Sequence, residues 1–300
     1  MKTPKIAIIG AGSVGTTTAY ALILQNTAAE IILVDVNEVR CRGEILDLSD
    51  VLPFSQTTLV HTGSMADAGQ ADIIIIAAGA RQKQGQSRLD LLETNKKVIA
   101  SIIRSMQPIA PNTIIIMVSN PLDILTLHAQ NLAGLPRSQI FGTGTFLDSL
   151  RLRELIAQRI GVAQSSIHAY ILGEHGDSQF PAWSLAHVDG LSLSSFAQLT
   201  QEVLDSIAQQ ARDKAYEIIS CKDATFFGIA TCVTKMCHAI LFDQKLILPL
   251  SVYQEKMGVC MSMPVVLGKS GIEKQLDVVL SPDEQQKLER SAEALRKMAK

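Results

Sequence analysis

Hydrophobic and polar positions follow two alternating patterns in the first half of the chain. Short runs that are apolar on both faces and rich in isoleucine and valine are typical of buried parallel strands, and they cover residues 5–9, 31–36, 72–77, 113–119 and 140–142. Amphipathic segments at residues 14–24 and 89–106 have the periodicity of helices. Strands and helices therefore alternate, and this order predicts an α/β fold built on a doubly wound parallel sheet.

The pattern changes in the second half of the chain. Helical periodicity covers residues 146–160, 197–219 and 226–241, whereas strands joined by turns are predicted at 246–253, 259–267 and 272–279. A last helix has a clear start, with Ser281 as cap, Pro282 in the first helical position and Glu284 placed for a capping box. These elements predict a second, mixed α/β domain, so we expect one domain at residues 1–142 and another at 143–300.

Composition excludes several classes of protein. The chain has 300 residues, 47% of them hydrophobic and 19% charged, and a formal net charge of −2, which argues against nucleic acid or an anionic membrane as main partner. Its apolar runs are too short for a signal peptide or a membrane span. The five cysteines lack close metal-ligand spacing, and Cys232, Cys237 and His238 lie in an apolar helical run. We therefore expect no metal and a reduced, cytoplasmic protein.

A glycine-rich turn follows the first predicted strand. In the segment from Gly10 to Gly15, the first glycine permits a tight turn, Gly12 lets the backbone approach a pyrophosphate, and Gly15 lets helix and strand pack closely. Ser13 and Val14 open the helix, whose N-terminal N–H groups attract phosphates. Asp35 ends the next strand, where a carboxylate accepts hydrogen bonds from ribose and repels a 2′-phosphate. The pattern predicts a Rossmann domain that binds NAD rather than NADP; the alternative is a structural turn beside a surface aspartate.

A histidine between two glycines is the main candidate for acid–base chemistry. Gly173-Glu174-His175-Gly176-Asp177 places an imidazole, which exchanges protons near neutral pH, in the second half of a chain that opens with a dinucleotide fingerprint. A nicotinamide carries hydride. Together these groups supply the proton and the hydride that interconvert a carbonyl and an alcohol.

Five motifs in order resemble the L-lactate/malate dehydrogenase family, and its lactate branch most closely. They are the glycine turn, Ala80-Arg81-Gln82 with Ser87-Arg88, Ser119-Asn120-Pro121, Asp148-Ser149-Leu150-Arg151, and the His175 segment. The resemblance covers most of the chain and implies a Rossmann domain followed by a mixed α/β catalytic domain, usually in dimers or tetramers. It implies an NAD-dependent L-lactate dehydrogenase that interconverts pyruvate and L-lactate.

The resemblance also implies roles for the reacting residues. His175 donates a proton to the carbonyl oxygen and accepts one in the reverse direction, and Asp148 orients its imidazole. Arg151 binds the substrate carboxylate as a bidentate partner, although an i, i+3 surface ion pair with Asp148 is the simpler alternative. Arg88, after a polar segment that serves the family as a lid, polarises the carbonyl. Asn120 hydrogen-bonds near the carbonyl and nicotinamide, and Pro121 follows a cis peptide bond.

Substrate choice is expected to depend on Gln82 and Thr225. Malate enzymes of the family carry arginine where this chain has Gln82, and a neutral residue there leaves a second carboxylate unpaired. Thr225 bounds the pocket and favours a small side chain, while Ile229 packs on the nicotinamide. Malate dehydrogenase, a branched-chain (hydroxyisocaproate) dehydrogenase and a non-catalytic NAD(H)-binding protein remain alternatives.

Two further cations match an effector site of the family. Arg153 and His168 align with positions that bind fructose 1,6-bisphosphate between subunits of allosteric bacterial lactate dehydrogenases. Non-allosteric members carry the same pair, and Arg153 could also be an ordinary exposed helical arginine. The pair therefore indicates an effector site without establishing regulation.

Overall fold

A nine-stranded sheet runs through the molecule in the order β14-β13-β12-β6-β5-β4-β1-β2-β3. The computed structural model describes residues 3–57, 59–80 and 88–299. Six strands of the first half are parallel: β1 (Lys5–Ile9), β2 (Glu30–Val34), β3 (Leu59–Thr62), β4 (Ile73–Ile76), β5 (Ile114–Met117) and β6 (Ile140–Gly142). Their order is that of a Rossmann fold, which confirms the fold class.

The sheet does not stop at residue 142. Strands β12 (Leu246–Gln254), β13 (Val259–Gly268) and β14 (Gly271–Gln275) continue it as antiparallel neighbours, joined to β6 where Ser251 pairs with Gly142. One sheet therefore spans both parts of the chain. The division at residue 142 stays a prediction.

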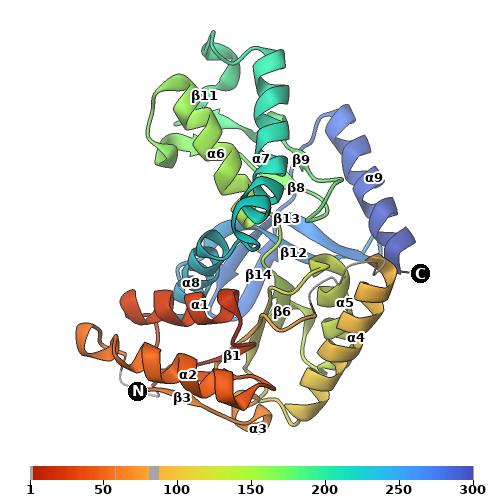
Figure 1. Ribbon diagram of the computed structural model, residues 1–300. Coiled ribbons are helices and arrows are strands. Elements are labelled where there is room, and N and C mark those ends of the chain that lie inside the picture. The colour runs from red at the N-terminus through yellow and green to blue at the C-terminus, as the bar shows by residue number, and fades with distance from the viewer. Residues whose placement is uncertain (1–2, 58, 81–87, 300) are drawn as a thin grey trace.

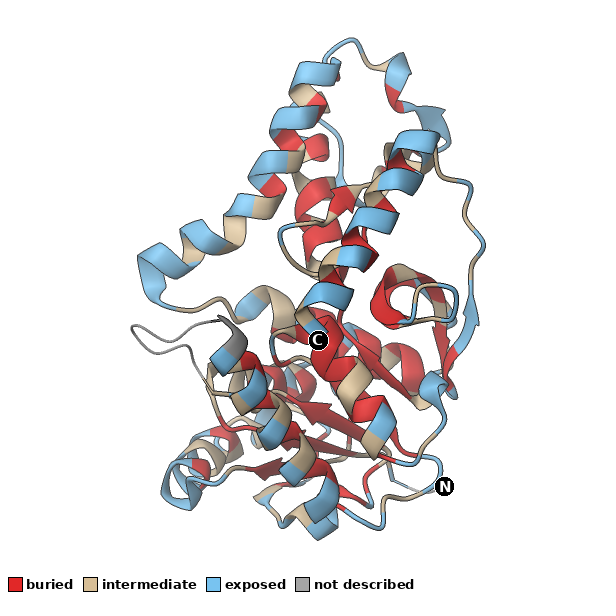
Figure 2. Ribbon diagram, turned by 90° about the vertical axis from the view of Figure 1, so that its right-hand side faces the viewer, coloured by how far each residue is buried: buried red, intermediate tan, exposed pale blue. Residues whose placement is uncertain are grey.

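Alternate residues of each parallel strand face different helices. In β4, Ile73 and Ile75 pack in the cluster that contains residues of α1 (Ser13–Leu24), α2 (Glu38–Ser49) and α8 (Phe227–Leu241). Ile74 and Ile76 pack instead with α4 (Arg88–Ser105), α5 (Leu122–Leu132) and α9 (Pro282–Ala299). The strands are thus buried on both faces, as Figure 2 shows, which explains their unbroken apolar sequence.

A third apolar cluster lies outside the main sheet. Helices α6 (Phe146–Ile160) and α7 (Gln201–Lys222) pack with residues of the short strands β7 (Ile167–His168) and β10 (His187–Val188), and β10 pairs with the exposed strand β11 (Leu191–Ser192). In Figure 1 these elements form a lobe above the sheet. Another short pair, β8 (Ile171–Leu172) and β9 (Phe180–Pro181), leads into and out of the His175 segment.

Several element ends differ from the sequence prediction, and at α7 and β14 a local hydrogen bond marks the observed end. Helix α7 begins at Gln201 rather than 197, because the Thr200 hydroxyl caps it by accepting from the Val203 amide. Strand β14 ends at Gln275, after which the Leu276 amide donates to Pro264. Strand β2 ends at Val34. The predicted capping box of α9 is present, since the Ser281 and Glu284 side chains and amides bond reciprocally.

The cysteines lie where ordinary core residues would. Cys232 and Cys237 are buried in α8, and burial raises the pKa of the Cys232 thiol to about 12. All five cysteines are free, and within the described ranges no three His, Cys, Asp or Glu side chains gather as a metal site. No helix in that part of the chain is long and apolar enough to cross a membrane.

Candidate active site

The Asp148 carboxylate on α6 lies between two basic side chains, those of His175 and Arg151. Its Oδ2 is 2.9 Å from Nδ1 of His175, and its Oδ1 accepts from Nη1 of Arg151 at 3.1 Å. The Asp148 and Arg151 side chains are only 3% and 7% exposed, so the pair is not the surface ion pair that its i, i+3 spacing also allows. The His175 side chain is 31% exposed and can meet a solvent-borne molecule.

Charge and hydrogen bonding set the protonation of this group. Burial favours neutral Asp148, but the pKa of its carboxyl is lowered because the charges and hydrogen bonds of His175 and Arg151 outweigh burial. Burial also favours neutral His175, yet the pKa of the imidazole is raised because the Asp148 charge and hydrogen bond prevail. A protonated His175 is therefore stabilised near neutral pH, as a proton donor requires.

The His175 segment is held from two sides. At its start, the Ile171 amide donates to the Ser149 hydroxyl of α6 at 2.8 Å, which fixes the segment relative to Asp148. From α9, the buried Ser291 Oγ accepts from the Glu174 amide at 2.6 Å and lies 3.0 Å from the Ser178 hydroxyl. Gly173 has φ +89°, and a Cβ there would lie 2.6 Å from the Ser291 Oγ, so only glycine fits this turn.

A second buried carboxylate, missed in the sequence, also contacts this segment. Asp123, in the first turn of α5, accepts from the His175 amide at 2.8 Å and from the Ser251 hydroxyl at 2.5 Å. The available signal was its position three residues after Asn120, in a segment that the family motif already marks.

The Asn120–Pro121 peptide bond is cis, as the resemblance implies. Its carbonyl at Asn120 accepts from Nδ2 of Asn95 at 2.9 Å, and Oδ1 of Asn95 accepts from the Ala80 amide at 2.8 Å. Asn95, buried on α4, therefore ties the end of the chain before residue 81 to the Asn-Pro turn. Asn95 was not predicted from the sequence either, because a lone helical asparagine carries no signal.

The predicted lid falls mostly outside the described residues. Arg81, Gln82 and Ser87 lie there, so nothing in the structure bears on their predicted roles. Arg88 is the first residue of α4, and its side chain is also not among those that the structure describes.

Thr225 and Arg151 line one small cavity between α6, α7 and α8. The cavity has a volume of about 220 Å³, and its other walls include Leu147, Ile218 and Gly228. Asp223 ends α7 with φ +65°, a conformation that aspartate tolerates better than most residues. Ile229 is partly buried against the core around α1 and α8.

The glycine turn has the geometry of a dinucleotide cradle. Gly10 has φ +109°, and a Cβ at Gly15 would lie 1.9 Å from the Gly10 carbonyl oxygen, whereas one at Gly12 would meet nothing within 4 Å. Ser13 and Val14 open α1, whose N-terminus has no side-chain cap and no acidic residue in its first turn. These features fit a bound pyrophosphate. Asp35 adds an unexpected contact, because its carboxylate accepts from the amides of Ala11 at 2.7 Å and Asn37 at 2.8 Å.

The two candidate effector residues lie on contacting elements, α6 and β7, but differ in exposure. Arg153 points inward, donating from Nε to the Ala169 carbonyl at 2.9 Å, with its guanidinium 5.3 Å from the Tyr170 ring centre. Burial lowers the pKa of Arg153, although Tyr170 opposes this shift. His168 is exposed and stacks on His187 with ring centres 4.6 Å apart. Arg153 is thus not the freely exposed helical arginine considered above.

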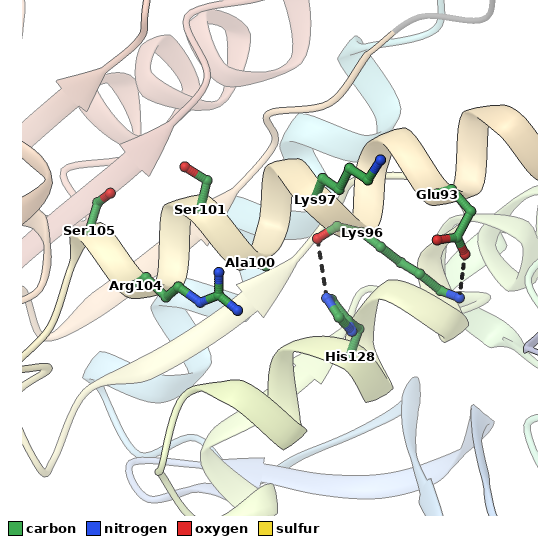
Figure 3. A pocket seen from close by; sticks show the side chains of 8 residues that line it. All are labelled: Glu93, Lys96, Lys97, Ala100, Ser101, Arg104, Ser105 and His128. Atoms are coloured by element: carbon green, nitrogen blue, oxygen red, sulfur yellow. Dashed lines mark hydrogen bonds and ion pairs between the residues drawn. The ribbon is translucent and has the colours of Figure 1, made fainter.

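A separate groove of about 430 Å³ lies between α4 and α5. Figure 3 shows His128 on α5 facing the α4 side chains, with its Nε2 3.1 Å from the Lys96 carbonyl. Among the residues that the structure describes, none of the predicted site residues lines this groove.

A cradle for a dinucleotide and a histidine–carboxylate pair beside a buried arginine define the class of protein as a dinucleotide-dependent dehydrogenase. Comparison with known proteins narrows that class. A model of the lactate/malate dehydrogenase NAD binding domain matches residues 4–142, and one of the lactate/malate dehydrogenase alpha/beta C-terminal domain matches residues 145–300. The chain belongs to the lactate/malate dehydrogenase family.

Its relatives match over nearly their full length. L-lactate dehydrogenase A of Rhizopus oryzae is 46% identical over 292 residues, 97% of this chain and 91% of the relative. L-lactate dehydrogenase of Lacticaseibacillus casei is 38% identical over 302 residues, 98% and 93% of the two chains. The crystal structure of a lactate dehydrogenase from a Medee basin deep-sea metagenome library superposes with a TM-score of 0.96 at 36% identity, covering 99% of this chain and 98% of that one. The resemblance and the NAD cofactor inferred from the sequence are thereby confirmed.

Proposed function

We propose that this protein is an NAD-dependent L-lactate dehydrogenase that interconverts pyruvate and L-lactate. The observation that carries the proposal is the position of Asp148, whose two oxygens hold His175 and Arg151 at 2.9 and 3.1 Å. A 2-keto acid offers a carbonyl and a carboxylate on adjacent carbons, so it needs a proton donor and a bidentate cation side by side. The names of the relatives support lactate over other 2-hydroxy acids.

In the proposed mechanism, bound NADH supplies hydride to the carbonyl carbon. Arg151 binds the substrate carboxylate, and protonated His175 donates from its imidazole to the carbonyl oxygen. Asp148 keeps the imidazole oriented through Nδ1 and stabilises its cationic form until the proton leaves. Arg88 polarises the carbonyl and Asn120 hydrogen-bonds beside it, as the family resemblance implies. In the direction of lactate oxidation, neutral His175 accepts the hydroxyl proton.

For the cofactor, we propose that Gly10, Gly12, Ser13, Val14 and Gly15 surround the pyrophosphate and that Asp35 binds ribose. Each Asp35 oxygen already accepts one backbone amide, and a carboxylate oxygen can accept a further hydrogen bond. Ile229 would pack on the nicotinamide.

For the substrate, we propose that Gln82 and Thr225 select the small methyl group of pyruvate. The cavity of about 220 Å³ beside Thr225 and Arg151 leaves a longer 2-keto acid as the second candidate. We further propose a cytoplasmic homo-oligomer, a dimer or tetramer, with fructose 1,6-bisphosphate bound near Arg153 and His168. Sedimentation and activity with and without that effector test the assembly and the regulation together.

The proposed function is tested by following NADH oxidation at saturating cofactor with pyruvate, oxaloacetate and 2-ketoisocaproate in parallel. A large advantage in kcat/KM for pyruvate is expected. Preference for oxaloacetate or 2-ketoisocaproate would replace the proposal with the malate or hydroxyisocaproate activity. Gln82→Arg should move preference toward oxaloacetate, and an unchanged preference would remove Gln82 from the role of discriminator.

A further inference from the structure

The groove of about 430 Å³ between α4 and α5 is lined mainly by charged and hydroxyl side chains. Most of its walls come from one stripe of α4, whose residues recur at the three- and four-residue spacing of a helix face, and His128 of α5 lies opposite (Figure 3). The small residues Ala100 and Ser101 lie in the middle of this stripe, between the longer side chains of Lys97 and Arg104. The groove is therefore hollow at its centre and cationic on both sides of it.

The positive charge of the groove is not balanced by carboxylates. Lys96 pairs with Glu93, with 2.8 Å between Nζ and Oε1. Among the residues that the structure describes, no carboxylate lies within ion-pair distance of Lys97 or Arg104, and both residues are exposed. Two cations thus remain unpaired at one concave surface, an arrangement that attracts anions.

Helix stability alone does not account for these side chains. Arg104 lies in the last turn of α4, where a cation interacts favourably with the helix dipole, but Lys97 is in the middle of the helix and gains nothing of this kind. Ser101 and Ser105 also line the groove, although serine is a poorer helix former than alanine. Their hydroxyls supply hydrogen-bond donors beside the two cations.

His128 adds a group whose charge responds to a bound anion. Burial lowers the pKa of its imidazole, and the positive charges of Lys96 and Arg104 contribute to the lowering, whereas the Lys96 carbonyl and the Glu93 charge oppose it. The free groove therefore favours neutral His128. An anion in the groove would offset the neighbouring cations and favour the protonated imidazole.

The spacing of the cations indicates an extended anion. Lys97 and Arg104 are seven residues apart, so their backbones are separated by roughly 10 Å along the helix axis. A chain of phosphates carries charge along its length and can reach both side chains, which a single phosphate cannot. Among the described residues that line the groove, none is a large apolar one, so an acidic peptide would find no pocket for an apolar anchor.

We propose that this groove binds a linear polyphosphate, either free or as the phosphate chain of a nucleotide, through Lys97, Arg104 and the two serine hydroxyls. The cations bind the phosphate oxygens by charge-assisted hydrogen bonds, and His128 takes up a proton as the ligand enters. The site is separate from the glycine turn of α1 and from His175, and the proposal does not depend on which 2-keto acid is the substrate.

The experiment titrates tripolyphosphate into the protein without divalent cations and with saturating NADH, which fills the cofactor site. K97Q/R104Q should raise the Kd roughly 10-fold or more, because two charge-assisted contacts are lost. The control K256Q/K269Q removes the same charge from two exposed lysines outside the groove and should leave the Kd within about twofold of the parent. R153Q, at the candidate effector site, should likewise have no effect. Retained NADH affinity shows that each variant is folded.

Three outcomes would overturn the proposal: no binding to the parent, an equal loss of affinity in K256Q/K269Q, or a loss in R153Q. Binding of polyglutamate in place of tripolyphosphate would also overturn it, in favour of an acidic protein partner. A parallel titration with ATP identifies the source of the phosphate chain, since ATP should bind as tightly as tripolyphosphate if the groove accepts nucleotides and more weakly if it accepts only the free chain.

A local measurement tests the same site without any charge-removing variant. The ring resonance of His128, assigned with H128Q, should titrate at higher pH when tripolyphosphate is saturating, because the bound anion favours imidazolium. An unchanged titration of His128 would place the ligand elsewhere and overturn the proposal.

Discussion

Two glycines of the cofactor turn should respond to the same alanine substitution in opposite ways. A methyl group at Gly12 meets nothing within 4 Å, and the backbone there, at φ −82°, suits any residue. Replacing glycine lowers the conformational entropy of the unfolded chain, which stabilises the folded state by about 0.4–1 kcal/mol. Alanine is a poorer helix cap than glycine, and this loss offsets the gain. The free energy of unfolding of cofactor-free Gly12→Ala should therefore stay within about 0.5 kcal/mol of the parent.

The affinity for NADH should change at the same position, although the stability does not. If Gly12 faces the pyrophosphate, an added methyl must displace either the ligand or the loop, and overpacking of this kind costs about 1–3 kcal/mol. The dissociation constant for NADH should then rise roughly 5- to 150-fold.

Gly15→Ala acts on the fold itself. Its Cβ would lie 1.9 Å from the Gly10 carbonyl oxygen, about 1.5 Å inside ordinary contact, and that oxygen belongs to the backbone and cannot rotate away as a flexible side chain could. Helix α1 must move away from the turn, so we expect a loss of about 2 kcal/mol or more in stability together with weaker NADH binding.

Urea unfolding and NADH fluorescence titration measure the two quantities, with Gly43→Ala as control. Gly43 lies on exposed α2, where an added Cβ meets nothing within 4 Å, so alanine there should raise stability by up to about 1 kcal/mol and leave NADH binding unchanged. Gly12→Ala with parental NADH affinity would refute the proposed approach of the pyrophosphate. Gly15→Ala with parental stability would refute the close packing of turn and helix.

Three other substitutions test the site. His175→Ala should keep NADH affinity and lower turnover roughly 100- to 10,000-fold, and parental turnover would exclude it as the acid–base group. Asp148→Asn should move the alkaline limb of pyruvate reduction to lower pH, because it removes the charge that raises the His175 pKa; a limb unmoved in a kinetic pH profile contradicts this. Asp35→Ser should relax the preference for NADH over NADPH in parallel titrations, and a retained preference would place ribose selection elsewhere.

Local sequence patterns predicted the strands and helix ends that depend on neighbouring residues alone. Apolar runs located β1, β4, β5 and β6 because buried parallel strands need no polar face, and Ser281 with Pro282 marked the start of α9. They did not reveal that β12 pairs with β6, because a pairing across more than a hundred residues leaves no local periodicity.

The candidate site divides in the same way. The sequence motifs identified His175, Asp148 and Arg151 as candidates. In the structure, Asp148 contacts both His175 and Arg151. Asp123 and Asn95 were missed because their importance comes only from what folds against them: a distant backbone amide in one case and two separate loops in the other. The Asp35 contact with the Ala11 amide was missed for the same reason.

The hydrogen bond from the Glu174 amide to Ser291 has a consequence for the order in which this protein becomes competent during synthesis. Every predicted site residue precedes residue 230 in the chain, yet the buried hydroxyl that supports the His175 segment belongs to Ser291, in the middle of α9. A nascent chain, or a fragment shortened by a carboxypeptidase past Ser291, would carry the full set of reacting groups without the support for their central loop. The His175 segment therefore gains this support only after α9 has been synthesised and has docked.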